Sequence, residues 1–142
     1  MADEPAHKSV KTGVKAGSGR PPGYLWNVDV LNRSFDEAKS FLDDDQYDHL
    51  AEQVRELARQ DDPTHSEIVD VKPIEDFYEI SDKGGVLKKL SVRVFFCVHK
   101  ESRTIVVLGT MKKENNGPTP QAEKITMRRR RRHYLENYHP DS

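Results

Sequence analysis

The sequence predicts an α+β fold, in which a small antiparallel sheet packs against a two-helix hairpin and a C-terminal helix follows. Three observations support this prediction. The chain has 142 residues, which is enough for about one compact domain. Apolar residues recur at helical spacing over residues 34–58, and after Pro73 they alternate with a period of two. Apolar residues make up 35% of the chain, so a modest core is expected.

The chain begins with a segment that differs from the rest in composition. Residues 1–22 are rich in Lys, Gly, Ser and Pro and have few apolar side chains, so we expect a disordered basic tail. The folded domain is expected over residues 23–142, and its first element is a strand over residues 25–31. On one face of that strand lie Trp26, Val28 and Val30.

Two acidic amphipathic helices are expected next. Ser34 and Glu37 have the spacing of a capping box, which predicts the start of the first helix. The cluster Asp43-Asp44-Asp45 offers caps for a second helix, and Asp62-Pro63 is expected to end it. The short connection between the two helices predicts a hairpin.

The second half of the domain reads as strands. Residues 74–80, 90–98 and 104–111 are the candidates, and Asp82-Lys83-Gly84-Gly85 is a strong turn signal between the first two. Their short connections predict an antiparallel meander. On the middle strand, Val92, Val94, Phe96 and Val98 are expected on one face, and Ser91, Arg93, Phe95 and Cys97 on the other.

A final helix is expected after these strands. Thr119 is the predicted cap, with Pro120 at the first helical position. The helix should continue to about Glu136. The predicted order is therefore strand, helix, helix, three strands and helix.

Formal charge is divided unevenly along the chain. The net charge is −1, but residues 23–82 carry five basic and seventeen acidic groups, whereas residues 83–142 carry fourteen basic and five acidic groups. This asymmetry indicates a polyanion-binding surface built from the C-terminal half. The alternative is that the acidic helices neutralise the basic strands within one fold.

Several classes of protein are disfavoured. No run approaches the roughly 18 apolar residues of a membrane helix, and the first residues lack the apolar core of a secretory signal, so we expect a cytoplasmic protein without a membrane segment. Cys97 is the only cysteine, which excludes an internal disulfide framework. No HExxH, P-loop, GxGxxG or GxSxG motif is present, so neither a metal nor a cofactor is predicted.

Basic residues around the strands are the first candidates for function. Arg93 lies mid-strand between apolar residues, and a buried arginine must either pair with a carboxylate or line a site that receives an anion. Lysines lie at the predicted strand ends, where an antiparallel meander brings them round one face and they can contact phosphates. These lysines are Lys83, Lys88, Lys89, Lys112 and Lys113.

The run Arg128–Arg132 and its neighbours are the second candidates. Five consecutive residues turn through more than a full helical circle, so they cannot all face one ligand. The run is a solvated face, an RNA or ribosome contact, or a targeting signal. His133 and Tyr134 follow it and carry groups that transfer protons or stack on bases, although a tyrosine near a C-terminus also often closes a core.

Several segments together resemble a known family. They are Phe77-Tyr78-Glu79-Ile80, Val92-Arg93-Val94-Phe95-Phe96, Ile105-Val106-Val107-Leu108-Gly109-Thr110-Met111-Lys112-Lys113, Thr119-Pro120, and the arginine run before Tyr134-Leu135. In this order they are similar to the RelE/HigB toxin superfamily, and in particular to its phage-derived HigB-like branch. The resemblance covers about residues 24–138.

This resemblance implies a RelE-like fold and a toxin of a type II toxin–antitoxin pair. Such toxins are metal-independent, ribosome-dependent endoribonucleases, whose partners are the ribosome, mRNA and a cognate antitoxin. The resemblance implies catalytic roles for Arg93 and for Lys112 or Lys113, and Tyr134 or His133 is expected to substitute for the family's tyrosine or histidine near the last helix. Lys83, Lys88 and Lys89 are candidates for clamping the RNA, and Arg128, Arg129, Arg132 and His133 are candidates for RNA binding. Two alternatives stay open: a relative that poisons DNA gyrase, and a nucleic-acid-binding module without catalysis.

Overall fold

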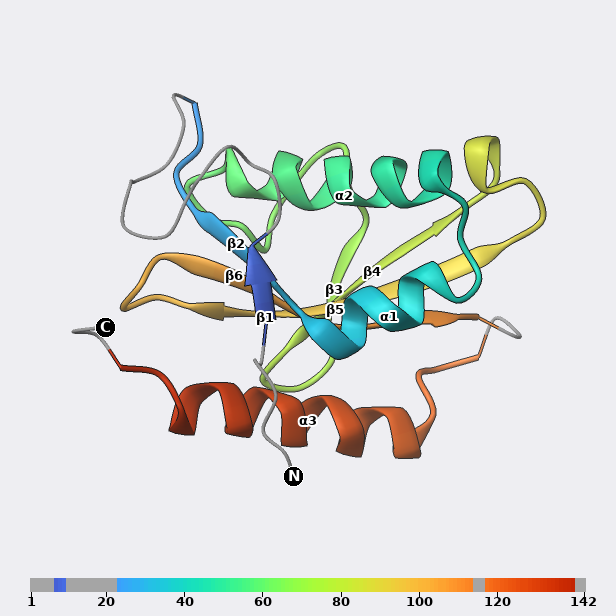
Figure 1. Ribbon diagram of the computed structural model, residues 1–142. Coiled ribbons are helices and arrows are strands. Elements are labelled where there is room, and N and C mark those ends of the chain that lie inside the picture. Colours follow the sequence, from blue (N-terminus) through green and yellow to red (C-terminus); the bar gives the residue numbers. More distant parts are fainter. Residues whose placement is uncertain (1–6, 10–22, 114–116, 140–142) are drawn as a thin grey trace.

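The computed structural model describes residues 7–9, 23–113 and 117–139, and it confirms the α+β class (Figure 1). None of the described helices is long and apolar enough to cross a membrane. The elements are β1 (His7–Ser9), β2 (Asn27–Leu31), α1 (Asn32–Lys39), α2 (Asp44–Ala58), β3 (Val71–Pro73), β4 (Tyr78–Lys83), the 3₁₀ turn η1 (Gly85–Leu87), β5 (Ser91–His99), β6 (Thr104–Lys112) and α3 (Gln121–Glu136).

The strands form one mixed sheet in the order β1-β2-β6-β5-β4-β3. The predicted meander β4-β5-β6 is antiparallel, as expected. The prediction of a wholly antiparallel sheet is wrong, because β2 pairs with β6 in parallel. The chain leaves β2 through two helices and three strands before it returns beside it, and such a long crossover permits parallel pairing.

The segment expected to be a tail contributes β1, which pairs antiparallel with β2 at the edge of the sheet. The rest of residues 1–22 lies outside the described residues. At the other side of the meander, the strand expected over residues 74–80 starts later than predicted: β4 begins at Tyr78 and continues to Lys83, and a separate strand, β3, precedes it at Val71–Pro73. Between them, the backbone N–H of Ile74 donates to the carbonyl of Phe77 and forms a turn.

Helices cover both faces of the sheet, with α1 and α2 on one face and α3 on the other (Figure 1). The alternation predicted for β5 is confirmed: Val92, Val94 and Phe96 pack under α1 and α2, whereas Phe95 and Cys97 pack under α3. Burial raises the pKa of the Cys97 thiol to about 12. The molecule therefore has two apolar cores separated by one sheet.

The start of α1 differs from the prediction. Ser34 and Glu37 form no capping box, and α1 begins at Asn32 without a side-chain cap. Both side chains instead contact Thr110, in the part of β6 that extends beyond the end of β2. Ser34 Oγ lies 3.1 Å from Thr110 Oγ1, and the backbone N–H of Thr110 donates to Glu37 Oε1 at 3.0 Å. A sheet edge has unpaired N–H groups that need acceptors, and α1 supplies one.

The N-terminal cap of α2 was predicted correctly, whereas the position of its C-terminal end was not. Asp43 accepts from the backbone N–H of Gln46 and completes a capping box with it, as the acidic cluster indicated. The helix ends at Ala58, before Asp62-Pro63. The Ala58 carbonyl accepts hydrogen bonds from the backbone of residues 25 and 26, so the incoming chain uses a carbonyl that would otherwise lie at a free helix end.

The beginning of α3 also differs. Thr119 is not its cap: Pro120 occupies the cap position, and the helix runs from Gln121 to Glu136, which confirms the predicted end. The close approach of α3 to the sheet depends on Gly109, since a Cβ at this position would lie 2.3 Å from Met127 Cε. A side chain there would push the helix or its methionine away.

Candidate nucleic-acid interface

The sheet brings the predicted lysines together at one end. β4 ends at Lys83, β5 begins at Ser91 beside it, and β6 ends at Lys112, which pairs with Val92. The pairing of β5 with the chain after β6 extends one residue further, because the backbone N–H of Lys113 donates to the Ser91 carbonyl at 2.7 Å. The lysine end, as we call this region, consists of Lys83, Lys88, Lys89, Lys112 and Lys113.

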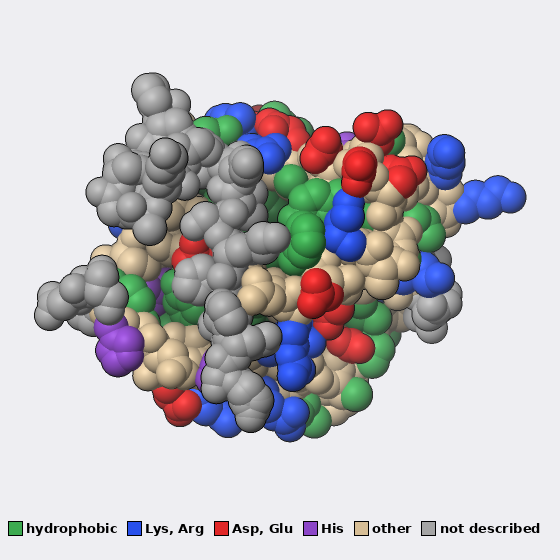
Figure 2. Space-filling view, viewed as in Figure 1, with side chains coloured by type: hydrophobic (Ala, Val, Ile, Leu, Met, Phe, Trp, Pro, Cys, Tyr) green, Lys and Arg blue, Asp and Glu red, His purple; other side chains and the backbone are tan. Residues whose placement is uncertain are grey.

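The amino groups of the lysine end are accessible. All of these lysines are exposed except Lys113, which is half-buried. Within the described residues, none of the salt bridges or side-chain hydrogen bonds involves these amino groups. Figure 2 shows Lys and Arg side chains projecting at the right of the molecule, where η1 lies in Figure 1. Among the described residues, an anion that binds at this end would therefore displace no ion pair of these amino groups.

Lys88 has an unusual backbone. Its φ is 59° and its ψ is −117°, a conformation that favours glycine because a Cβ crowds the backbone. Residues held in such regions cost about 1–3 kcal/mol and cluster at functional sites. Gly84 and Gly85 precede it with positive φ as well. The turn thus has a charged residue at a position where glycine would adopt the same backbone conformation without strain.

Arg93 does not lie at this surface. It is 3% exposed, and its guanidinium donates to Thr119 Oγ1 at 2.8 Å and to the Gly117 carbonyl. Glu79, which is 1% exposed, lies 3.8 Å from Arg93 and accepts from Thr119 at 2.5 Å. Of the two alternatives for Arg93, the carboxylate pair is therefore the one observed. The carboxylate comes from β4.

This buried pair explains why Thr119 does not cap α3. The Thr119 hydroxyl is shared between Arg93 and Glu79, and it fixes the chain just before the helix. Sequence reasoning missed Glu79, although the signal was present, because Glu79 interrupts an apolar run in the same way as Arg93. Two opposite charges buried in neighbouring strands must meet or be otherwise compensated.

Most of the arginine run faces other parts of the protein. Three of its members form ion pairs with acidic residues from the first half of the domain. These pairs are Arg128–Glu75 at 2.7 Å, Arg130–Glu37 at 2.7 Å and Arg131–Asp76 at 3.2 Å. Arg130 also donates to the Leu108 carbonyl at 2.8 Å, so it joins α3 to both α1 and β6. Neutralisation within the fold accounts for these three charges.

The remaining two members of the run, and the histidine that follows it, point to solvent. Arg129, Arg132 and His133 are exposed. Residues three and four apart share one helix face, so these three side chains form a small basic face on α3. His133 Nδ1 lies 3.3 Å from the Asn137 amide on the next turn.

Tyr134 lies far from the lysine end. It is 7% exposed, its hydroxyl lies 3.4 Å from Asp29 Oδ2, and its ring packs edge-on against His99. Burial, with the Asp29 carboxylate, raises the pKa of the Tyr134 hydroxyl. His99 and Val92 are seven residues apart on β5, which is about 23 Å along a strand. Tyr134 and the lysines are therefore not brought together.

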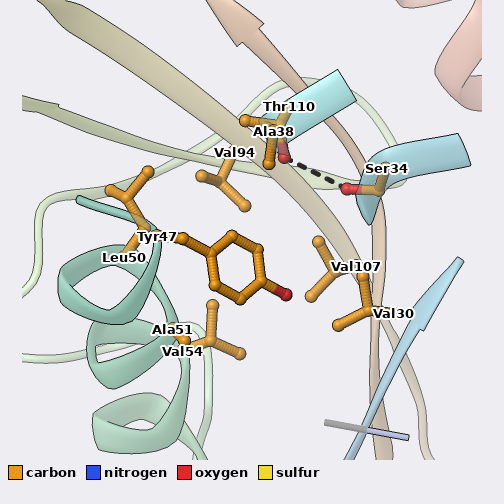
Figure 3. A pocket seen from close by; sticks show the side chains of 10 residues that line it. All are labelled: Val30, Ser34, Ala38, Tyr47, Leu50, Ala51, Val54, Val94, Val107 and Thr110. Carbon is orange, nitrogen blue, oxygen red and sulfur yellow. Dashed lines mark hydrogen bonds between the residues drawn. The ribbon is translucent and has the colours of Figure 1, made fainter. Parts of the chain in front are cut away.

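A small cavity lies between α1, α2 and the sheet. Its volume is about 30 Å³, which is room for about two water molecules. The Tyr47 ring projects into it, and the hydrogen bond between Ser34 and Thr110 lies at its side (Figure 3). Burial raises the pKa of the Tyr47 hydroxyl. The lining is mainly apolar, so this cavity does not suit a phosphate.

One polar cluster near the lysine end has no counterpart in the sequence interpretation. His49 of α2 lies 2.6 Å from the carboxylate of Asp82 in β4. Gln53 donates to the same carboxylate at 2.9 Å. His49 and Gln53 are four residues apart and share a helix face, but their common partner lies in a distant segment that the sequence does not link to them.

Neither metal ligation nor similarity to known proteins indicates a function. Within residues 7–9, 23–113 and 117–139, no group of three or more His, Cys, Asp and Glu side chains could hold a metal ion. The chain matches no family model, no curated protein and no solved structure. Its function is therefore inferred from its own residues and their geometry.

Proposed function

We propose that the protein is a toxin of a type II toxin–antitoxin pair, with a RelE-like fold, that cuts mRNA on the ribosome without a metal ion. The resemblance of residues 24–138 to the RelE/HigB superfamily supports this proposal. The order β2, α1, α2, the antiparallel meander β3-β4-β5-β6 and then α3 is compatible with it. A cytoplasmic location, the ribosome and a cognate antitoxin follow as parts of the same proposal.

The lysine end is the observation that carries this proposal. Five lysines lie within a few residues of the ends of β4 and β6 and the start of β5, and their amino groups have no carboxylate partner among the described residues. Lysines in such an array bind phosphates through charge, with an affinity that falls as salt rises. The strained backbone of Lys88 also supports the proposal, because such strain clusters at functional sites.

The proposed reaction is a transesterification. The RNA 2′-oxygen loses its proton and attacks the adjacent phosphorus, and the bond to the 5′-oxygen breaks as that oxygen gains a proton from water. The products are a 2′,3′-cyclic phosphate and a 5′-hydroxyl. Lys112 and Lys113, at the end of β6, are suited to stabilise the extra negative charge of the pentavalent intermediate.

Arg93 has a different role in this proposal from the one that the resemblance implied. Its guanidinium is buried against Glu79, Thr119 and Gly117, so it cannot contact a phosphate in this arrangement. It holds Gly117 and Thr119 just before α3, and on β5 it follows Val92, whose partner on β6 is Lys112. Arg93 is therefore a positioning residue.

A second candidate function is RNA binding without cleavage. The observation that favours it is the separation of the four predicted catalytic residues, since Arg93 is buried and Tyr134 lies at the opposite end of β5 from Lys112. Under this alternative the lysines bind RNA, and Arg93 and Tyr134 only stabilise the fold.

Induced expression in a bacterial host tests the proposal. Incorporation of labelled methionine and thymidine is followed side by side, and mRNA ends are mapped by primer extension. We expect methionine incorporation to fall first and new 5′ ends to appear within translated codons. A double variant, Lys112→Ala with Lys113→Ala, serves as the control and should restore growth. An early fall in thymidine incorporation would instead indicate gyrase, and binding without new RNA ends would indicate the second candidate.

A further inference from the structure

The carboxylate of Asp82 is held from several sides. Its Oδ2 accepts from Gln53 at 2.9 Å and lies 2.6 Å from His49 Nε2. Its Oδ1 accepts from the backbone N–H of Lys83 at 2.9 Å. Gln53 turns its amide N–H to Asp82 even though its own Oε1 is then buried without a partner in the described part of the chain. Asp82 is therefore a strong acceptor in a defined orientation.

This arrangement determines which nitrogen of His49 carries the proton. A carboxylate only accepts hydrogen bonds, so the nitrogen that faces it, Nε2, must be the donor. In the neutral ring, Nδ1 then has the lone pair. Among the described residues Nδ1 has no hydrogen-bond partner, and the His49 side chain is 39% exposed. The ring is oriented by one nitrogen and can accept a proton at the other.

His49 lies at the lysine end. Asp82, Val92 and Lys112 are neighbours across three strands and share the face under α1 and α2, so the Cα atoms of Asp82 and Lys112 are about 10 Å apart. One turn before His49, the Gln46 amide donates to the Val86 carbonyl of η1 at 3.2 Å. This contact places α2 beside the turn that carries Lys88. A phosphate bound by the lysines can therefore lie close to the imidazole.

We propose that His49 is the general base of the RNA cleavage proposed above, oriented by Asp82. This inference rests on the proposed function. His49 Nδ1 takes the proton from the 2′-hydroxyl, the 2′-oxygen bonds to phosphorus, and the 5′-oxygen leaves with a proton from water. The imidazole becomes an imidazolium, which the Asp82 carboxylate stabilises. A histidine held by a carboxylate in this way is a recurrent arrangement for a base that acts near neutral pH.

The molecule also contains a matched control. His65 lies 2.8 Å from Asp62, but this pair is in the loop after α2, is largely exposed and has no lysine end beside it. Glu52, one turn after His49, forms ion pairs with Arg55 and Arg59, so part of the acidic surface of α2 is already compensated. A histidine–aspartate pair alone therefore does not define the site, whereas the pair beside the lysines does.

The test measures single-turnover cleavage of mRNA on programmed ribosomes by the full chain. His49→Gln keeps an N–H donor for Asp82 but has no basic nitrogen, and we expect it to cut at least about 100-fold more slowly, with unchanged ribosome binding and thermal unfolding. His65→Gln should cut at the wild-type rate. His49→Gly should regain part of its rate when free imidazole is added, which a purely structural role of His49 would not allow.

The outcomes separate this inference from the function on which it rests. If the wild-type protein cuts no mRNA, the proposed function and the proposed role of His49 are both wrong. If the wild-type protein cuts and His49→Gln cuts at the same rate, His49 is not the base, but the proposed function stands. A slower His49→Gln whose loss is explained by weaker ribosome binding, with no effect of imidazole on His49→Gly, would also overturn the role of the base.

Discussion

The lysine end and the arginine run of α3 are equally basic in sequence but differ in what their charges do. The amino groups of the lysine end have no carboxylate partner in the described part of the chain. In contrast, Arg128, Arg130 and Arg131 of α3 pair with acidic residues that lie 53 to 93 positions earlier in the chain. Formal charge in a sequence is thus not the same as charge available to a ligand.

The difference has a physical basis. A guanidinium presents its donors in a planar fork, which suits carboxylates and carbonyl groups in a partly buried interface, and Arg130 uses it for both Glu37 and Leu108. A lysine ammonium is strongly hydrated and tends to stay at the surface. The basic half of the chain therefore contains both internal contacts and a candidate ligand site.

The largest expected effect concerns the buried arginine between these two regions. Arg93→Ala leaves Glu79 buried without its partner, which should lower the free energy of unfolding by about 3–5 kcal/mol. Urea denaturation measures this loss. Arg129→Ala, on the exposed face of α3, is the control and should change stability by less than about 0.5 kcal/mol. Equal stability of Arg93→Ala and the wild type would show that the pair does not form in solution.

A second substitution tests how α3 is held against the sheet. Gly109→Ala places a Cβ 2.3 Å from Met127 Cε and 3.0 Å from Arg130 Nη1, so α3 must shift or its side chains must rearrange. We expect a loss of about 1–3 kcal/mol in urea denaturation. In the double variant with Met127→Ala, the total loss should be smaller than the sum of the two single losses, because the methionine atoms nearest to the new Cβ are then absent. Strictly additive losses would contradict the close contact.

Matched pairs of substitutions compare the two basic regions directly. Binding of a single-stranded RNA is measured by fluorescence anisotropy at several salt concentrations. Lys83→Gln with Lys89→Gln should reduce the slope of log affinity against log salt by about 1.4, at about 0.7 for each phosphate contact. Arg128→Gln with Arg131→Gln should leave the slope nearly unchanged, since those charges are already paired. An equal reduction in both pairs would remove the distinction between the regions.

The smallest effect is expected at Lys88. Lys88→Gly relieves the strain of a positive φ and should stabilise the protein by about 1 kcal/mol in thermal unfolding. The same substitution should weaken RNA binding, because one amino group is lost. Lys89→Gly is the control, since it removes an adjacent charge where no positive φ is recorded. Lower stability of Lys88→Gly would show that this turn is not strained.

Local patterns predicted much of the fold. The alternation in β5, the cap at Asp43 and the end of α3 at Glu136 all follow from neighbouring residues, and all are confirmed. The predicted caps at Ser34 and Thr119 are wrong for a common reason. Both hydroxyls are buried against partners distant in the chain, Thr110 for one and Arg93 with Glu79 for the other, and such partners compete with a local cap.

The candidate site likewise combines residues that local patterns predicted with contacts that they did not predict. Periodicity and turn chemistry act over a few residues, so they were enough to predict the α+β class, the meander and the lysines at its turns. The parallel pairing of β2, the contact of Arg93 with Glu79 and the contact of His49 with Asp82 arise from the packing of whole elements. These contacts join segments 14 to 77 residues apart, and which charges meet across such separations depends on how whole elements pack.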